Sequence, residues 1–347
     1  MNNKMTNKEH ESNHRHDVFM VVSSQTDNLS TSKKLKMKVA QQNEISIYTI
    51  LAMAQSFFWL FIFPDLCKPL WPETFGRIQS HFIQEVILNH CTTAVFILYT
   101  LCTLPIYYLQ LPFFEQFKIS PDKKWAWQDN DVKKREEFWK MVTKSIKLCA
   151  FNLLFLVTTA TVANRYLMDM IGLPGPSFDV DNWPSKMDMA RQIIMLTLIH
   201  EFLFHTAHKI VHIYPSLYKY HKVHHEYKNN VVIAAQHNHP IDYVISIALP
   251  VLAALTIVQP HSFTQCQWAI YILYTNLDDH VGYSFPFSPV RWFPFASLTQ
   301  EHEFHHSVNI GCYSSKLDVF ERLFKTNSRF YPWEDKRCKT IRAKKFL

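Results

Sequence analysis

Six long apolar runs constrain the fold of this 347-residue chain more than any other feature of its sequence. They cover residues 45–63, 86–109, 148–167, 190–204, 243–258 and 263–277. At about 1.5 Å per residue, the first run nearly matches a hydrocarbon core of about 30 Å. The fourth or sixth run alone could be a core helix of a soluble protein, but the first three together favour membrane spans.

A polar turn at residues 259–262 separates the fifth run from the sixth, which predicts a helical hairpin. Only five glycines are present, and neither GxGxxG nor GxxxxGK[ST] occurs, which argues against a nucleotide-binding fold. We therefore predict an all-α integral membrane protein with about four to six hydrophobic helices, in which about four span the bilayer and about two lie at its surface.

The distribution of charge predicts the orientation of these helices. The net charge is +7, and the basic residues lie beside the apolar runs, which favours a membrane role over nucleic-acid binding. The loop at residues 118–147 carries nine Lys and Arg against five acids, whereas residues 168–189 carry one Lys and four Asp. The positive-inside rule places the first of these loops, and with it both termini, in the cytosol.

The chain divides into four parts on this basis. Residues 1–44 are polar and read as a disordered cytosolic tail, and no apolar signal-peptide core follows the start. Residues 45–144 would hold the first membrane helices and the basic loop, and residues 145–327 the remaining apolar runs. Residues 328–347 form a basic tail ending in Lys344-Lys345-Phe346-Leu347, which resembles a dilysine signal for retrieval to the endoplasmic reticulum membrane.

Histidines recur in local patterns between residues 200 and 306. His208 and His212 are four residues apart, which places them one turn apart on one face of a helix. His239 and His280 stand alone near the membrane ends of the fifth and sixth runs. Two triplets share the spacing i, i+3, i+4, which predicts three rings on one helical face: His221, His224 and His225, and His302, His305 and His306.

These ten imidazoles are too many for one zinc ion, which takes about four ligands, and they suit two adjacent metals. Imidazole binds iron, zinc and copper, so the spacing alone leaves the metal open. The seven cysteines form no CxxC pair, which argues against a zinc finger or a thioredoxin-type site. A pH-sensitive surface interface is the alternative, and two copies of HxxHH fit it less well. The sequence predicts a histidine-rich metal-binding cap on the cytosolic side.

The motifs together resemble the fatty acid hydroxylase/sterol desaturase superfamily of membrane di-iron oxygenases. The resemblance covers about residues 145–327, which it implies form a di-iron catalytic domain. Within the superfamily, the chain is most like the C-4 methylsterol oxidases. Supporting pieces are Glu201 seven residues before His208, and the segment at residues 309–326. The motifs are HKIVH (208–212), HKVHH (221–225), HNHPID (237–242), DDHVGYSFP (278–286) and EHEFHH (301–306).

The resemblance implies that the ten histidines hold two iron ions that activate O2. Electrons would come from NAD(P)H through cytochrome b5 and its reductase. The favoured substrate is a sterol oxidised at a C-4 methyl group. Metal-bound histidines usually give their second N–H to another group, and we name five candidates for contacts of this kind. They are Glu201, His205, Asp242, Asp279 and Glu301.

Other functions share the same expected metal site. A sterol C-5 desaturase, a sterol side-chain-modifying enzyme and a fatty acid hydroxylase would differ only in the substrate pocket. A catalytically silent membrane protein with a structural zinc pair is the alternative from another class. The sequence leaves the oxidised carbon open.

Overall fold

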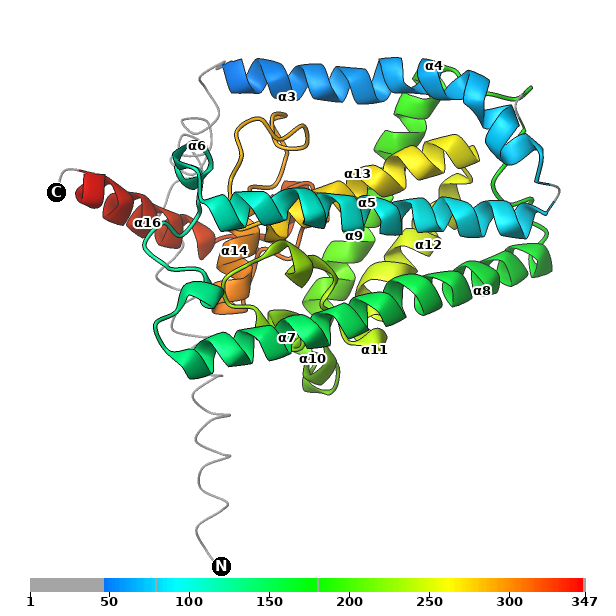
Figure 1. The fold of residues 1–347 in the computed structure, drawn as a ribbon. Helices are drawn as coiled ribbons and strands as arrows, with labels where there is room; N and C mark the ends of the chain where they lie inside the picture. Colours follow the sequence, from blue (N-terminus) through cyan, green and yellow to red (C-terminus); the bar gives the residue numbers. More distant parts are fainter. Residues whose placement is uncertain (1–46, 79, 180, 346–347) are drawn as a thin grey trace, which may run out of the picture.

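The computed structural model describes residues 47–78, 80–179 and 181–345 (Figure 1). The predicted tail at residues 1–44 and the last two residues of the KKFL end lie outside this part. Within it every regular element is a helix, and the only β-pairings are two isolated bridges, Lys118 with Tyr283 and Ala296 with Leu317. The all-α prediction is confirmed.

The six apolar runs all fall in helices, and most of these helices are longer than the runs. The first run contains α3 (Ile47–Phe57) and ends at the first residue of α4 (Phe63–Cys67), and the second lies in α5 (His81–Leu109). The third belongs to α7 (Val132–Ala150), η5 (Phe151–Leu156) and α8 (Val157–Met170), and the fourth to α9 (Lys186–Ile213). The last two are η8 (Tyr243–Ala248) with α12 (Leu249–Val258), and α13 (Ser262–His280).

Four helical stretches have the length and apolar composition to cross a membrane: Ile47–Gly76, Phe82–Leu109, Val132–Met170 and Pro240–Val258. They leave large apolar side chains uncovered by protein, as on α5, where Leu98 is 63% exposed and Leu101 56%. Lipid would remove such side chains from water, so the chain is a multi-pass membrane protein. The fourth and sixth runs, in α9 and α13, do not meet these criteria, in keeping with two non-spanning helices.

The basic loop predicted at residues 118–147 is helical in its second half. Asp131 caps α7, because its carboxylate accepts a hydrogen bond from the backbone N–H of Lys133 at 2.9 Å. From there α7 continues through η5 into α8, so the lysines of this segment lie on the extension of a membrane helix. The helix also runs across the predicted domain boundary at residues 144 and 145.

The polar turn between the fifth and sixth runs is present. α12 ends at Val258, Gln259 adopts a left-handed conformation (φ 48°), and the ring of His261 accepts a hydrogen bond from Phe263 N at the start of α13. α9 packs with both helices through an apolar cluster that includes Leu196, Ala254 and Trp268.

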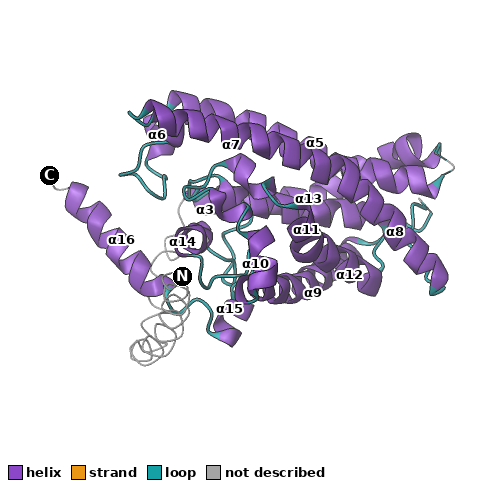
Figure 2. Ribbon diagram, turned by 90° about the horizontal axis from the view of Figure 1, so that it is seen from below, coloured by secondary structure: helices purple, strands orange, loops and turns teal. Residues whose placement is uncertain are grey.

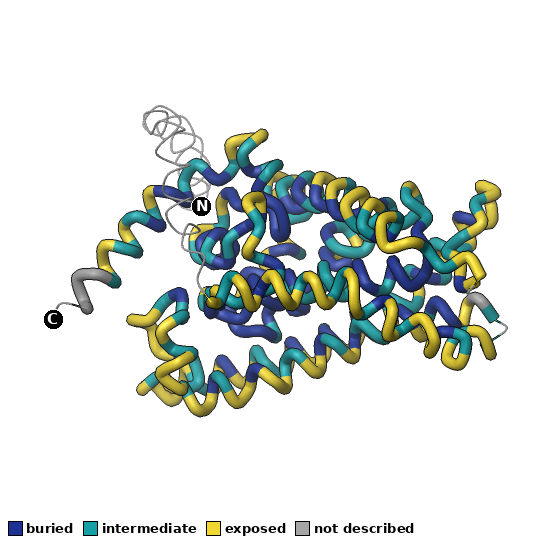
Figure 3. Tube along the Cα trace, turned by 90° about the horizontal axis from the view of Figure 1, so that it is seen from above, coloured by how far each residue is buried: buried dark blue, intermediate teal, exposed yellow. Residues whose placement is uncertain are grey.

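The helix α5 and the continuous helix from α7 to α8 run along one side of the molecule, and α9 and α12 lie on the opposite side (Figures 1 and 2). Exposed residues follow the outside of the molecule, and buried residues fill its centre (Figure 3). In Figure 1, α6 (Pro112–Glu115), α14 (Thr299–Val308) and α16 (Phe330–Lys345) lie toward the end with the C-terminus, and α10 (Pro215–His221) and α11 (Pro240–Asp242) lie below the centre. The other short elements are η6 (His224–Glu226), η7 (Val232–Gln236) and α15 (Val319–Phe324).

Candidate metal centre

Nine of the ten predicted histidines converge in two groups, and within each group the metal-capable atoms lie within 4.8 Å of one another. The five-histidine cluster consists of His208, His212, His221, His225 and His305. The four-histidine cluster consists of His224, His280, His302 and His306. All nine are buried except His212, which is half-buried.

Each HxxHH triplet is divided between the two clusters. His221 and His225 face the five-histidine cluster, whereas His224 faces the other; His302 and His306 face the four-histidine cluster, whereas His305 faces the other. Consecutive helical residues point about 100° apart, so the last two rings of a triplet diverge while the rings at i and i+4 stay together. The expectation that all three rings share one face was wrong, and each triplet instead joins the two clusters.

Hydrogen bonds fix which nitrogen of several rings is free to bind a cation. Backbone carbonyls can only accept, so a ring nitrogen beside one must carry the proton. This applies to Nδ1 of His208 beside Tyr313 O (2.8 Å) and to Nδ1 of His280 beside Asn276 O (2.7 Å). Nδ1 of His305 beside Gly311 O (2.7 Å) and Nδ1 of His306 beside Tyr227 O (3.2 Å) follow the same pattern. In all four rings the lone pair is therefore on Nε2.

Gly311 is needed where it lies. Its φ of +73° is a conformation that side chains disfavour, and a Cβ atom there would collide with the carbonyl of Thr326. The glycine therefore lets the chain turn so that its carbonyl faces the His305 ring.

Several of these Nε2 atoms point at each other. In the five-histidine cluster, Nε2 of His208 and Nε2 of His221 are 3.2 Å apart. Nδ1 of His221 lies 3.0 Å from both oxygens of Asp242 and therefore carries the proton. The Nε2 atoms of His208 and His221 thus each present a lone pair to the other. Two facing lone pairs repel, whereas a cation that binds both removes the repulsion. In the four-histidine cluster His302 Nε2 lies 3.0 Å from His280 Nε2 and 3.1 Å from His306 Nε2.

Burial lowers the pKa of eight of the nine clustered rings, which favours the neutral form that binds metals. Burial, with neighbouring imidazoles, lowers the pKa of His208 to about 3, and burial lowers the pKa of His280 to about 4. Neutral rings, an all-nitrogen donor set and convergent lone pairs fit a pair of transition-metal ions.

Of the five side chains predicted to orient these rings, only Asp242 contacts a cluster histidine. Glu201 instead accepts hydrogen bonds from the backbone N–H groups of Ser315 (2.8 Å) and Lys316 (3.0 Å). The other three contact residues outside the clusters. Nε2 of His205 lies 3.1 Å from the hydroxyl of Thr326, Asp279 accepts a hydrogen bond from the hydroxyl of Ser315, and Glu301 accepts one from the N–H of Leu298.

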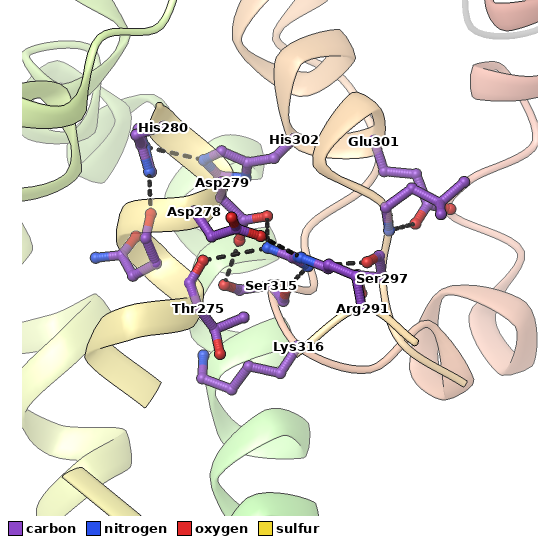
Figure 4. Close-up of polar contacts among 12 residues, drawn as sticks. Thr275, Asp278, Asp279, His280, Arg291, Ser297, Glu301, His302, Ser315 and Lys316 are labelled. Carbon is purple, nitrogen blue, oxygen red and sulfur yellow. Dashed lines mark hydrogen bonds and ion pairs between the residues drawn. The ribbon is translucent and has the colours of Figure 1, made fainter. Parts of the chain in front are cut away.

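Arg291 is a positioning residue that the sequence did not reveal (Figure 4). Its guanidinium is buried and donates to Asp278 Oδ2 at 2.8 Å and to Asp279 Oδ1 at 2.5 Å. It also donates to the carbonyl of Ser297 at 2.8 Å, just before α14. Because His280 directly follows the two aspartates and α14 carries His302, Arg291 ties together the two segments that build the four-histidine cluster.

His200, His237 and His239 lie outside both clusters. His239, predicted as a ligand, caps α11 instead: its Nδ1 accepts from Ile241 N at 3.2 Å, and its ring packs on Tyr220. His237 bridges Ser145 and Glu226 at 2.8 and 2.9 Å. His200 is buried against Trp268, and its Nδ1 has no hydrogen-bond partner among the described residues.

A cavity of about 200 Å³ begins at the clusters and extends between the hydrophobic helices. Along α13 it is lined from His280 back to Gln265, which corresponds to about 22 Å of helix. Members of both clusters line one end: His208, His221, His224, His280 and His302. Apolar side chains line much of the remainder, among them Val157, Val251, Leu252, Leu255, Ile272 and Leu273.

Comparison with known proteins agrees with this arrangement. Residues 193–326 match the family model described as fatty acid hydroxylase. Methylsterol monooxygenase 1 of Gallus gallus is 26% identical over 71% of this chain and 78% of its own length. Methylsterol monooxygenase 1 of Danio rerio is 28% identical over 74% and 85%. Fatty acid hydroxylase ahd1 of Mycosarcoma maydis is 25% identical over 77% and 64%.

No solved structure matches the chain. All nine clustered histidines lie within the matched family region, residues 193–326. The comparisons confirm the resemblance to the fatty acid hydroxylase/sterol desaturase superfamily, and the chain is an oxidoreductase of the monooxygenase type.

Proposed function

We propose that the protein is a di-iron monooxygenase that oxidises a sterol at a C-4 methyl group with O2. The observation that carries this proposal is the convergence of nine imidazoles in two adjacent clusters, five of which line one end of a largely apolar cavity. The names of the methylsterol monooxygenases among its relatives favour the sterol over other lipids.

The five-histidine and four-histidine clusters would each hold one iron. His239 is left out of this ligand set because its ring nitrogen caps α11. Bound iron would supply the activation of O2 that an unactivated C–H bond requires. The contribution of this chain is to keep the rings neutral and oriented, with the carbonyls and Asp242 holding the outer nitrogens, and to line the cavity with side chains that exclude water.

The electrons would come from NAD(P)H through cytochrome b5 and its reductase. Four exposed lysines, Lys123, Lys124, Lys133 and Lys134, form a basic surface suited to an acidic donor protein. Changing all four to Glu is expected to slow reduction by cytochrome b5 at low salt, and the difference should shrink as salt rises. Equal rates at low salt would show that these lysines serve only membrane topology.

We also propose that the protein resides in the endoplasmic reticulum membrane with both termini in the cytosol. The basic residues of 118–147 and the dilysine at Lys344 and Lys345 support this placement. Changing both lysines to Ser is expected to release the protein to later compartments, which microscopy of the full chain would detect. Unchanged retention would contradict the role of the dilysine.

The decisive experiment is purification in detergent under anaerobic, iron-replete conditions, followed by metal analysis and turnover assays. About two irons per chain and O2-dependent oxidation of a 4-methylsterol with donor proteins are expected. Zinc alone with no turnover would favour a structural zinc pair. Turnover of a fatty acid, or desaturation or side-chain oxidation of a sterol, would favour the other enzymes that share this metal site.

Accumulated lipids in cells that lack the protein give an independent measurement. Accumulation of 4-methylsterols is expected, because the substrate of a missing enzyme builds up. Accumulation of a different sterol or of a fatty acid would move the proposal to that substrate.

A further inference from the structure

A sterol bound in the cavity would place there a polar hydroxyl group as well as an apolar ring skeleton. Near the clusters most polar side chains that line the cavity already have partners. Asn276 donates from Nδ2 to the carbonyl of Ala235 at 3.2 Å, and Ser246 donates to Asp242 at 2.8 Å. Gln236 also lines the cavity, is 3% exposed, and its Oε1 has no hydrogen-bond partner among the described residues.

Contacts along the chain place Gln236 close to the four-histidine cluster. It ends η7, directly after Ala235, whose carbonyl accepts from Asn276. Asn276 lies one helical turn before His280, and its own carbonyl accepts from His280 Nδ1 at 2.7 Å. The Gln236 backbone is therefore one residue away from a direct hydrogen bond to α13, the helix that carries His280.

Among the lining residues outside the two clusters, whose own rings His224 and His302 also have an unpartnered Nδ1, a second unpartnered polar atom lies farther away. His200 Nδ1 has no partner, and His200 lies eight residues before His208 on α9, a separation of about 12 Å along the helix. Phe204 fills the space between these two rings, with ring centroids 5.7 Å from His200 and 5.4 Å from His208. The two unpartnered atoms thus mark two distances from the histidines at which a polar group could bind.

The chemistry of a 4-methylsterol decides between them. Its hydroxyl is on C-3, the carbon next to C-4, so the hydroxyl must lie close to the histidines whenever a C-4 methyl group does. A hydroxyl bound at His200 would instead bring a carbon about 12 Å away to the clusters, on the opposite part of the sterol.

We propose that Gln236 binds the C-3 hydroxyl of the sterol, with Oε1 accepting a hydrogen bond from the O–H group, and that this contact sets which carbon faces the metal site. Gln236 is a specificity residue on this proposal, which rests on the proposed sterol function. The apolar side chains of α12 and α13 along the cavity, such as Leu255 and Ile272, would cover the remainder of the sterol.

The test measures equilibrium binding of two radiolabelled ligands to the full-length protein in detergent: a 4-methylsterol and its 3-methyl ether, which cannot donate a proton. The wild type is expected to bind the alcohol about tenfold more tightly than the ether. Gln236→Met should bring this ratio to about one with ether binding unchanged, because it removes only the acceptor. Gln236→Glu keeps an acceptor oxygen and should retain the preference, so it tests the idea even if Gln236→Met fails to fold.

His200→Leu is the matched variant for the second position and is expected to keep the preference for the alcohol. Loss of preference in His200→Leu but not in Gln236→Met would overturn the proposal and place the hydroxyl far from the histidines. Equal binding of alcohol and ether by the wild type would overturn it as well. A Gln236-dependent preference without oxidation at C-4 in the turnover assay would leave this proposal standing and contradict the proposed reaction alone.

Discussion

In the five-histidine cluster a carboxylate, Asp242, holds one ring and another ring is half-buried. The four-histidine cluster is fully buried, and two of its rings, His280 and His306, donate to backbone carbonyls. Four of the five rings of the first cluster come from residues 208–225, so local helical spacing nearly assembles it. The second cluster draws on η6, α13 and α14, and the Arg291 network must first bring the last two together. The first cluster therefore depends mainly on local sequence, and the second on tertiary packing.

The largest expected effect comes from removing a ring of the four-histidine cluster. His302 Nε2 faces both His280 and His306, so His302→Ala leaves two opposed rings without the ring between them. Turnover should fall at least about 1000-fold, and bound iron should drop from about two to about one per chain. Metal analysis and circular dichroism check this; loss of both irons with intact helices would show that the clusters do not fill separately.

His224→Ala tests the same cluster from the other HxxHH motif. Activity should be abolished while the membrane helices remain, because His224 lies in the short η6 segment outside the candidate spans. Normal turnover in this variant would refute the ligand assignment.

Arg291→Leu should weaken the four-histidine cluster, because it removes the contacts that hold the segments carrying His280 and His302 together. The substitution leaves Asp278 and Asp279 buried without their cation, which costs about 3–5 kcal/mol of stability. Iron in the four-histidine cluster should be lost first, as followed by metal content during thermal unfolding. Arg191→Leu removes an exposed pair with Asp188 and is the control that should leave the melting temperature unchanged.

A smaller effect is expected for Asp242→Asn, which acts on the five-histidine cluster. The amide keeps the shape but removes the charge that holds His221 Nδ1–H. Metal affinity of that cluster should fall about 10–100-fold. Competition with a chelator measures this, and His302 variants serve for comparison. Equal weakening of both sites would remove the distinction between them.

The smallest effect is expected for His239→Ser. Serine is a good N-cap, so it can replace the ring at the start of α11, and both activity and iron content should stay within about twofold of wild type. Loss of an iron would return His239 to the ligand set.

The sequence predicted those parts of the site that depend on short-range spacing. HKIVH and the two HxxHH motifs contain eight of the nine clustered histidines, and His280 was found as a single residue beside an apolar run. Spacing predicted all three rings of a triplet on one face, whereas neighbouring residues of a helix point about 100° apart and divide between the clusters. His239 was predicted as a ligand and lies outside both clusters, where a histidine before proline caps a helix.

The supporting contacts were largely beyond prediction for a physical reason. Carbonyls such as those of Tyr313 and Gly311 leave no trace in the side-chain sequence, and Arg291 acquires its role only when α13 meets the segment before α14. The acidic residues nearest to the histidines in sequence were reasonable candidates, and among the five that we named Asp242 contacts a clustered ring, that of His221. The helices themselves followed from apolar length, which is a local property.

The facing imidazoles also bear on how the molecule matures. His212 and His305 are 93 residues apart, so an ion held between them would cross-link distant segments much as a disulfide does. The metal site is incomplete until α14 has been synthesised and has packed against the other helices. Metal binding would then hold these segments together. A substitution far from the histidines that slows this docking would consequently yield an iron-poor protein, and its defect would resemble a failure of metal supply.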